Sequence, residues 1–305
     1  MNATVPDTRN KTVARRVLAA ALPGVPLKAL RLRMAGEGFD TWEAGDVIVK
    51  LPRTEETAAK VESERVIHEF LADPLGELIP SIRAIGPPTD EFPFPCLALE
   101  RARGRQGQTI EGPIIRPKPW AVVTLAKAAG SALSTLHSVS LPAARAVGIK
   151  RRDVKLAPHV DVSEGAVARA RKVVGQAVDT FLVDPISERS IKPGKTVLCH
   201  ADIKGEHIFV SEDGTRITAL IDWANVAIAD PAVDFGGLAI WLGPSFVREA
   251  LNAYAGPADE GTFDRAIFLA RAGMLVYLEA MLEGRENPAP APLIDAQLRA
   301  VFASY

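Results

Sequence analysis

The sequence predicts an α+β fold, with a smaller strand-rich part followed by a larger helix-rich part. Two observations predict the parts: short apolar runs between glycine and proline turns fill the first third of the chain, and apolar side chains recur at helical spacing beyond it. The glycine-punctuated stretch RARGRQGQTIEG, residues 101–112, is typical of a linker. We therefore expect a strand-rich part at 1–99, a hinge at 100–107 and a helix-rich part at 108–305.

Each element of the smaller part follows from a local pattern. VARRVLAAAL, residues 13–22, predicts a short helix, and RLRMAGEGFD and WEAGDVIVKL predict two strands around a glycine-bearing turn. A second helix is expected from Thr57 to Ala72. The apolar, proline-flanked run from Phe94 to Glu100 predicts a buried strand.

The larger part is predicted to begin and end with helices. Apolar residues from Leu125 to Leu136 and from Val167 to Phe181 recur at helical spacing, which predicts one helix in each stretch. KTVLC, HIFV and RITALI read as strands, and Asp213-Gly214 between the last two is a hairpin signal. Helices are expected again from Phe235 to the end.

Composition and charge exclude several functional classes. The chain of 305 residues is 48% hydrophobic and has a formal net charge of −1, which indicates no nucleic-acid or membrane-surface partner. No window approaches the ~18 consecutive apolar residues of a membrane-spanning helix, and the N-terminus lacks the apolar run of a secretory signal. We expect a cytoplasmic protein in which Cys96 and Cys199 are structural thiols.

The stretch HADIKGEHIFV, residues 200–210, concentrates two of the five histidines around an aspartate and a lysine. A metal hydrolase, a kinase catalytic loop and an ordinary polar turn are three hypotheses for it. A hydrolase would use His200, Asp202, His207 and Asp222 as metal ligands. That spacing is permissible, but it leaves Lys204 and the N-terminal third without a role.

The kinase hypothesis uses more of the chain. Phosphoryl transfer needs a carboxylate beside the acceptor hydroxyl, a divalent metal on the phosphates and cations for the developing charge. Asp202 would orient or deprotonate the hydroxyl, and Lys204 could reach the transferring group. His207 and Asp222 would bind the metal.

The pattern HADIKGEHIFV…GTRITALIDWANVAIADPAVDF resembles the aminoglycoside phosphotransferase family, which has a bilobal protein-kinase-like fold. Histidine at position 207, where asparagine is usual, is similar to the aminoglycoside 2''-phosphotransferase and macrolide 2'-phosphotransferase branches. The resemblance extends over roughly residues 30–245. Because magnesium prefers oxygen ligands, we expect His207 to bind one metal weakly, to favour Mn²⁺ over Mg²⁺ or to act through water.

The resemblance implies roles for residues of the smaller part, the nucleotide-binding lobe. Lys50 would bind phosphates and pair with Glu64, which falls on the core-facing stripe of its helix and is costly there without a partner. Gly36, Gly38 and Thr41 in GEGFDT match the nucleotide loop, where glycines let the backbone approach phosphate.

The resemblance also implies a base-binding segment, LERARG. Leu99 would lie behind the adenine or guanine ring, and the backbones of Glu100 and Ala102 would hydrogen-bond it. In the larger part we expect four residues to be structural: a buried His200 that braces the loop, a packed Trp223, and Asp230 and Asp234, which would cap a helix or hold the loop.

By resemblance, the substrates are ATP or GTP with Mg²⁺ or Mn²⁺, and a small hydroxylated acceptor, either an aminoglycoside or a macrolide. A kinase of an endogenous metabolite, a metal-dependent hydrolase and a silent nucleotide-binding module are the alternatives. Acidic and apolar residues are mixed through the C-terminal helices, so the sequence leaves the acceptor open.

Overall fold

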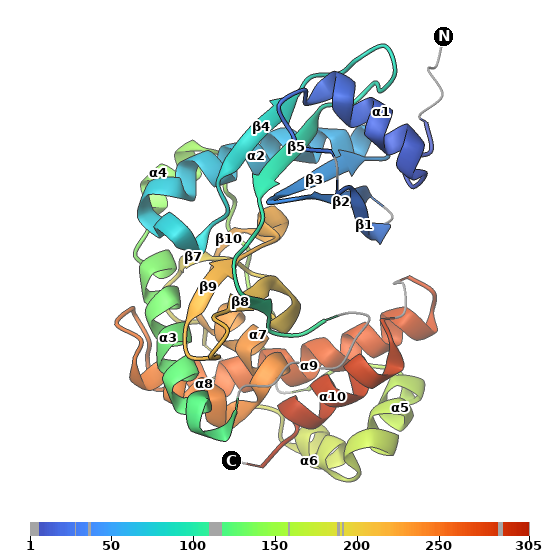
Figure 1. Cartoon of the computed structure of the whole chain (residues 1–305). Helices are drawn as coiled ribbons and strands as arrows, with labels where there is room; N and C mark the ends of the chain where they lie inside the picture. Colours follow the sequence, from blue (N-terminus) through green and yellow to red (C-terminus); the bar gives the residue numbers. More distant parts are fainter. Residues whose placement is uncertain are drawn as a thin grey trace. The chain divides into compact units, whose positions relative to one another are not determined.

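The computed structural model describes residues 6–27, 29–35, 38–109, 118–157, 159–187, 190, 192–285 and 289–304. The chain divides into two compact units, Met1–Ala102 and Arg103–Tyr305 (Figure 1).

Unit 1 contains an antiparallel sheet in which the described strands follow the order β1-β2-β3-β5-β4. Its elements are α1 (Lys11–Ala21), β1 (Arg31–Ala35), β2 (Phe39–Ala44), β3 (Val47–Pro52), α2 (Glu55–Leu75), η1 (Gly76–Leu78), β4 (Ile82–Gly86) and β5 (Cys96–Glu100). Both predicted helices and the buried strand predicted at residues 94–100 are present within a few residues of their expected limits. The two strands predicted over residues 31–51 are three in the structure, because a turn at Gly45, with a φ of 70°, separates β2 from β3, and β4 was not predicted.

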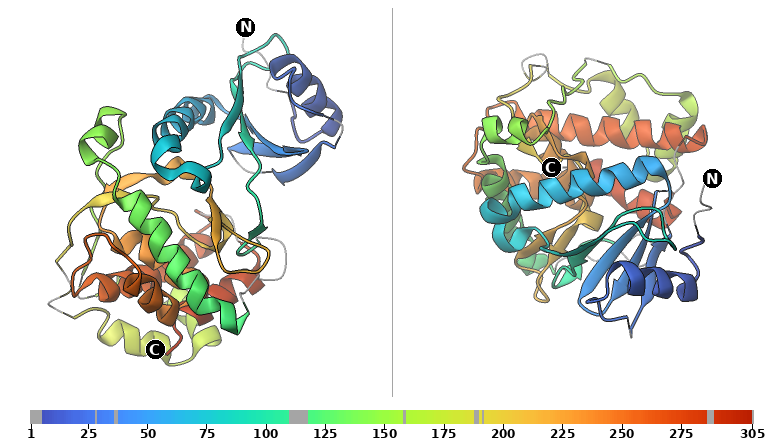
Figure 2. Two further views of the ribbon diagram at one scale, coloured as in Figure 1. Left: turned by 60° about the vertical axis from the view of Figure 1, so that its left-hand side comes forward. Right: turned by 90° about the horizontal axis from the view of Figure 1, so that it is seen from above.

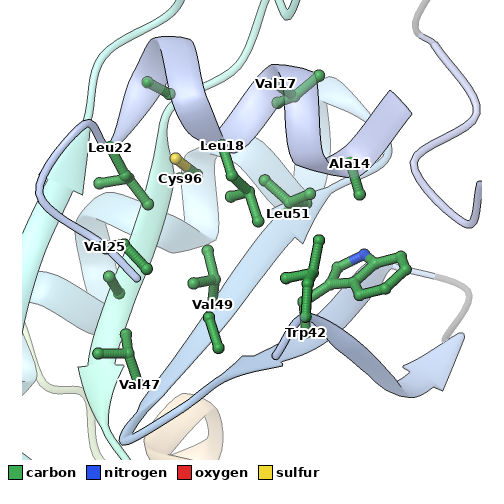
Figure 3. Close-up of a cluster of buried hydrophobic side chains, with 14 of the residues drawn as sticks. Ala14, Val17, Leu18, Leu22, Val25, Trp42, Val47, Val49, Leu51 and Cys96 are labelled. Carbon is green, nitrogen blue, oxygen red and sulfur yellow. The ribbon is translucent and has the colours of Figure 1, made fainter. Parts of the chain in front are cut away.

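Alternation along the strands gives the sheet two buried faces. Val49 and Leu51 of β3 and Cys96 of β5 pack against Leu18 and other apolar residues of α1 (Figure 3). The intervening Leu97 of β5 packs on the other face with residues of α2. The two helices therefore cover opposite faces of the sheet, as Figure 2 shows.

Helix α2 carries the acidic residue that the sequence predicted to lie in the core. Thr54 caps the helix and forms a reciprocal capping box with Thr57. The buried stripe includes Val61, Glu64 and Leu71. Lys50 of β3 points towards this helix, because it alternates with Val49 and Leu51 on the other face.

Unit 2 combines short strands with many helices. Its described elements are β6 (Arg105–Gln106), α3 (Pro119–His137), α4 (Leu141–Ala146), α5 (Glu164–Val174), α6 (Ala177–Val183), β7 (Val197–Cys199), η3 (Gly205–His207), β8 (Ile208–Val210), β9 (Ile217–Leu220), η4 (Trp223–Asn225), β10 (Ala227–Ala229), α7 (Ala232–Leu242), α8 (Pro244–Asn252), α9 (Thr262–Leu282) and α10 (Ala291–Val301). Helix α9 packs against α5, α7 and α10 (Figure 1).

Short strand pairs frame the HADIKGEHIFV segment. Strand β7 pairs with β10, and β8 pairs with β9 through the predicted hairpin, in which Gly214 has a φ of 72°. Within the stretch predicted to be a linker, Arg105–Gln106 forms β6 and pairs with β8. A two-residue strand has too few residues for a periodic signal, so the sequence did not indicate it.

The single helix predicted over Val167–Phe181 is wrong. The structure divides it into α5 and α6, and α5 ends where Gly175 adopts a φ of 61°. Glycine at this position takes the left-handed conformation without a Cβ penalty, as is common after a helix. The spacing of the apolar residues did not predict the break between α5 and α6.

The two cysteines are free and buried. Burial raises the pKa of the Cys96 thiol to about 11, so it stays protonated. None of the described helices combines the length and apolarity needed to cross a bilayer.

Leu18→Ala should test the core between α1 and the sheet. Leu18 is fully buried there, so truncation leaves a cavity and should lower the free energy of unfolding by about 2–5 kcal/mol. Urea unfolding measures the change. Ile85→Ala, at a position 41% exposed on β4, is the control and should cost less. Equal losses would contradict the packing.

Candidate active site

Asp202 lies in the loop between β7 and η3, with a side chain held from two directions. Asn225 Nδ2 donates to Asp202 Oδ2 at 3.2 Å. Lys204 Nζ lies 3.2 Å from Asp202 Oδ1. Because each oxygen has its own partner, the carboxylate plane is fixed, and the side chain remains partly exposed.

Lys204 is a cation surrounded by acidic groups. Burial on its own lowers the pKa of Lys204, but the charges of Asp202, Glu206 and Asp222 outweigh it and raise the pKa above 10.5. The ammonium therefore stays charged at neutral pH, and it can stabilise negative charge that develops beside Asp202.

His207 lies in η3, and its two ring nitrogens face different partners. Its Nδ1 lies 2.8 Å from the Asp202 carbonyl oxygen and donates to it when the ring is neutral. Its Nε2 lies 3.5 Å from Asp222 Oδ2. Burial and the Lys204 charge hold the pKa of His207 below 6.5 despite the nearby carboxylates, so the ring is neutral at pH 7.

Asp202, His207 and Asp222 fit a divalent cation. One donor atom from each lies within 4.8 Å of the others. A neutral His207 directs the Nε2 lone pair at a carboxylate oxygen, and a cation between two such acceptors would stabilise both. The imidazole nitrogen among the oxygen donors suits Mn²⁺ better than Mg²⁺, which prefers oxygen ligands.

The backbone is strained at two non-glycine residues of this cluster. Ala201 has a φ of 64° and Asp222 a φ of 67°, in the left-handed region. Hydrogen bonds hold Ala201 on both sides: its N–H donates to Asp234 Oδ1 at 2.7 Å, and its carbonyl accepts from Arg152 Nη2 at 2.9 Å. These bonds offset the strain and aim the following Asp202.

Asp234, at the start of α7, is the buried anchor of the loop. Besides Ala201, it accepts from the backbone N–H of His200 at 2.9 Å, and His137 Nε2 lies 3.0 Å from Oδ2. Burial by itself raises the pKa of Asp234, but the hydrogen bond from His137 and the other donors hold the pKa below 3.8. Asp234 is therefore structural, as expected.

His200 braces the loop from inside. Its Nδ1 accepts the backbone N–H of Asp202 at 3.3 Å, and its Nε2 donates to the Ile221 carbonyl at 3.0 Å. Both nitrogens are thus engaged, and the ring is fully buried beside Trp223, with ring centroids 4.4 Å apart. This geometry contradicts a metal-ligand role for His200 and weakens the hydrolase hypothesis.

Helix α7 approaches the loop closely because it carries glycine. A Cβ on Gly237 would lie 1.7 Å from the Ile203 carbonyl oxygen, so only glycine fits. Asp230, just before this helix, pairs with the buried Arg265 at 2.8 Å and accepts from the backbone of Ala232. This aspartate is structural, as expected.

In unit 1, Lys50 and Glu64 form a largely buried ion pair. Lys50 Nζ lies 2.6 Å from Glu64 Oε1, and the Glu64 residue is 4% exposed. His68, one turn further along α2, lies 3.8 Å from the same oxygen. Burial lowers the pKa of His68 below 6.5, so it is neutral and leaves Lys50 as the charged partner.

The other nucleotide-loop residues are only partly described. Gly36 lies outside the described residues. A Cβ on Gly38 would lie 2.7 Å from Thr57 Cγ2, which gives this glycine a packing reason independent of phosphate. Thr41 lies in β2 opposite Lys50.

The predicted base-binding residues lie at the end of β5 and just after it. Leu99 is buried, while Glu100 and Ala102 are less so. The Glu100 N–H already donates to the Ser81 carbonyl at 2.8 Å. That N–H is therefore engaged within unit 1.

Three residues of the site in unit 2 were not predicted. Asn225 and Arg152 contact the loop that carries Asp202, and His137 contacts the anchor of this loop, Asp234. Arg152 and His137 are 49 and 97 residues from their partners along the chain. No local motif carries such a signal, although Asn225 three residues after Asp222 could have been noted.

Residues 35–267 match the family model described as "Phosphotransferase enzyme family". The match covers more than half of the chain, and the chain belongs to this family. It is therefore a phosphotransferase, as its motifs predicted.

Solved structures share the fold. The GDP and kanamycin complex of APH(2")-IIia superposes with a TM-score of 0.67 at 16% identity, covering 94% of this chain and 96% of that one. Macrolide 2'-phosphotransferase MphH from Brachybacterium faecium superposes with a TM-score of 0.63 at 24% identity, covering 97% of this chain and 98% of that one. The predicted protein-kinase-like α+β fold is thereby confirmed.

A sequence relative gives a more local match. A stretch of 43 residues is 44% identical to the uncharacterized protein YcbJ of Bacillus subtilis (strain 168). This similarity spans 14% of each chain, so it covers about one seventh of that relative.

Asp234→Asn should destabilise unit 2. The amide cannot accept both backbone N–H groups of the loop, so we expect a loss of about 3–5 kcal/mol in the free energy of unfolding at pH 7. Because the folded-state pKa lies below 3.8, the carboxylate's contribution is present above that value and is lost as pH falls below it.

The difference in the free energy of unfolding between wild type and Asp234→Asn should therefore become smaller as the pH falls. Chemical unfolding at a series of pH values measures it. Asp153→Asn, in an exposed pair with Arg151, is the control and should leave the midpoint unchanged. A difference in unfolding free energy that does not change with pH would contradict the role of the Asp234 charge.

Proposed function

We propose that the protein transfers the γ-phosphoryl group of ATP or GTP to a hydroxyl of a small molecule. The observation that carries the proposal is the Asp202 carboxylate, oriented by Asn225 and Lys204 within reach of His207 and Asp222. A partly exposed, fixed carboxylate beside a cation is what a hydroxyl acceptor in phosphoryl transfer requires.

In the proposed reaction the acceptor oxygen forms a bond to the γ-phosphorus, and the bond to the bridging oxygen of the nucleoside diphosphate breaks. Asp202 orients the hydroxyl and takes its proton. Lys204 stabilises the charge on the transferring group. His207 and Asp222 would hold Mg²⁺ or Mn²⁺, which when bound neutralises phosphate charge.

Residues of unit 1 would bind the nucleotide. Lys50, with its charge oriented by Glu64, would contact the phosphates, and Gly36, Gly38 and Thr41 would form the loop over them. Leu99 would contact the base, and the backbones of Glu100 and Ala102 would hydrogen-bond it. The Lys50–Glu64 ion pair supports this assignment, because a lysine fixed by a buried carboxylate is pre-organised as a phosphate donor.

The charges of the C-terminal helices favour an acceptor with few positive charges. A polycationic aminoglycoside requires several uncommitted carboxylates. Among the described residues, many acidic groups of this region already have partners inside the protein. Three are paired with arginine: Asp259 with Arg265, Glu283 with Arg285 and Asp295 with Arg169. Two more keep their charge but are engaged in hydrogen bonds: Asp264 with Ser190 and Glu279 with the Ser163 N–H. A macrolide, or an endogenous metabolite with one amine, therefore suits the region better.

The experiment that tests this function is an acceptor panel with ATP and with GTP, each with Mg²⁺, with Mn²⁺ or with chelator. Aminoglycosides, macrolides and amino alcohols are scored by the mass gain of one phosphoryl group. We expect metal-dependent transfer, strongest to an acceptor with few charges. If nucleotide neither binds nor turns over with any metal, the proposal is wrong.

Asp202→Asn should lower the rate of transfer by roughly 10²–10⁴-fold, because the amide cannot take the proton. Nucleotide affinity, followed by thermal shift, should be nearly intact. Asp161→Asn removes an exposed carboxylate of the same unit and should leave transfer unchanged. Full turnover in Asp202→Asn would remove this residue from its proposed role.

Lys50→Ala should lower kcat/KM by a loss equivalent to about 2.7–4 kcal/mol, the contribution of one pre-organised donor. The matched control is Lys60→Ala, which removes an exposed lysine of α2 paired only with Glu56 in the described structure. Steady-state kinetics with varied nucleotide measures both. Unchanged kinetics in Lys50→Ala would contradict the assignment of unit 1 to nucleotide binding.

A further inference from the structure

Three buried amide and carboxylate side chains meet behind the catalytic loop. Gln297 of α10 donates from Nε2 to Glu206 Oε1 at 3.1 Å and lies 3.2 Å from Gln108 Oε1. Glu206 and Gln297 are each 6% exposed, and Gln108 is 1% exposed. Buried polar groups of this kind are costly unless hydrogen-bonded, so their mutual contacts fix all three.

Glu206 belongs to the loop itself. It lies in η3 between Lys204 and His207, so its buried side chain anchors the short stretch of backbone that carries both. Its Oε2 is buried and has no hydrogen-bond partner among the described residues, which leaves Gln297 as the side-chain donor to this carboxylate there. The Glu206 carboxylate is therefore held by a side-chain amide from a distant helix.

Further contacts from neighbouring residues restrict the position of Gly205 and Glu206. Gln106 Nε2 donates to the Glu206 carbonyl at 2.5 Å, and the Gln108 N–H donates to the Gly205 carbonyl at 2.9 Å. A Cβ on Gly205 would lie 2.5 Å from Trp241 Cδ1. The loop is thus closely packed against residues 106–108 and α7.

Gln297 is held in turn by the packing of α10. Leu293, Ile294, Leu298 and Val301 of this helix are buried, and α10 packs against α5, α7 and α9. A side chain on so constrained a helix transmits the position of the helix to its partner.

We propose that Gln297 is a positioning residue, whose amide holds Glu206 and thereby keeps Asp202, Lys204 and His207 in the geometry that phosphoryl transfer requires. This inference rests on the proposed function for its kinetic consequence. Gln297 does not contact the transferring group. It links the C-terminal helix to the loop that does the chemistry.

A charge-swap cycle tests the link. Gln297→Glu opposes two carboxylates at 3.1 Å in place of a donor and an acceptor, whereas Gln297→Glu with Glu206→Gln restores the bond in reverse. The Gln108 amide can flip to donate in either case. Gln176→Glu makes the same change at an exposed position and is the control.

The kinetic readout is the hydrolysis of ATP or GTP. Water is then the acceptor, so no other acceptor has to be identified. We expect Gln297→Glu to lower kcat on the order of 10- to 100-fold, as for a misplaced catalytic group, with the KM for nucleotide nearly unchanged. The double variant should recover most of kcat. An unchanged kcat in Gln297→Glu, or no recovery in the double variant, would overturn the proposal.

Hydrogen exchange of residues 203–208 gives a second readout that does not depend on activity. Exchange should be faster in Gln297→Glu and return towards wild type in the double variant. If Gln297→Glu does not fold, Gln297→Leu removes the donor without adding charge and should change exchange in the same direction. Unchanged exchange in the folded variant overturns the link, whereas a wild type that never turns over nucleotide overturns only the proposed function.

Discussion

The geometry of the loop that carries Asp202 depends on the hydrogen bonds that the Asp234 carboxylate accepts. The carboxylate accepts two consecutive backbone N–H groups, from His200 and Ala201, and it is itself fully buried. A buried charge requires several donors, and a left-handed Ala201 requires compensation. The same bonds satisfy both requirements, and Asp202 is aimed as a result.

The side chains of the candidate site are held in place by residues to which we assign no part in the reaction. Asn225 orients Asp202, and His200 uses both ring nitrogens on the backbone around it. In unit 1, the buried Glu64 orients Lys50 in the same manner. Lys50 and Glu64 are costly to bury alone and become fixed because they are paired with each other. Pre-organisation of this kind is what phosphoryl transfer demands of a protein.

Local periodicity predicted most of the elements but not their interruptions. The strands on either side of the Gly214 turn and the α2 stripe with Glu64 are regular enough to be read from the sequence. The break between α5 and α6 at Gly175 and the two-residue strand β6 are not, because each depends on contacts made by only a few residues. Phosphoryl transfer needs particular residue types at a fixed spacing, so the sequence could propose candidate site residues, and their roles stay predictions.

The sequence by itself determined the α+β character, because local composition and period predict its helices and strands. Its motifs indicated the class of protein through their resemblance to the aminoglycoside phosphotransferase family. Only the tertiary structure decided which nitrogen of His207 faces Asp222, why Gly237 must lack a side chain, and that Gln297 reaches Glu206 from 91 residues away. Hydrogen-bond direction and close approach between distant segments depend on packing in three dimensions. No pattern along a single chain encodes them locally.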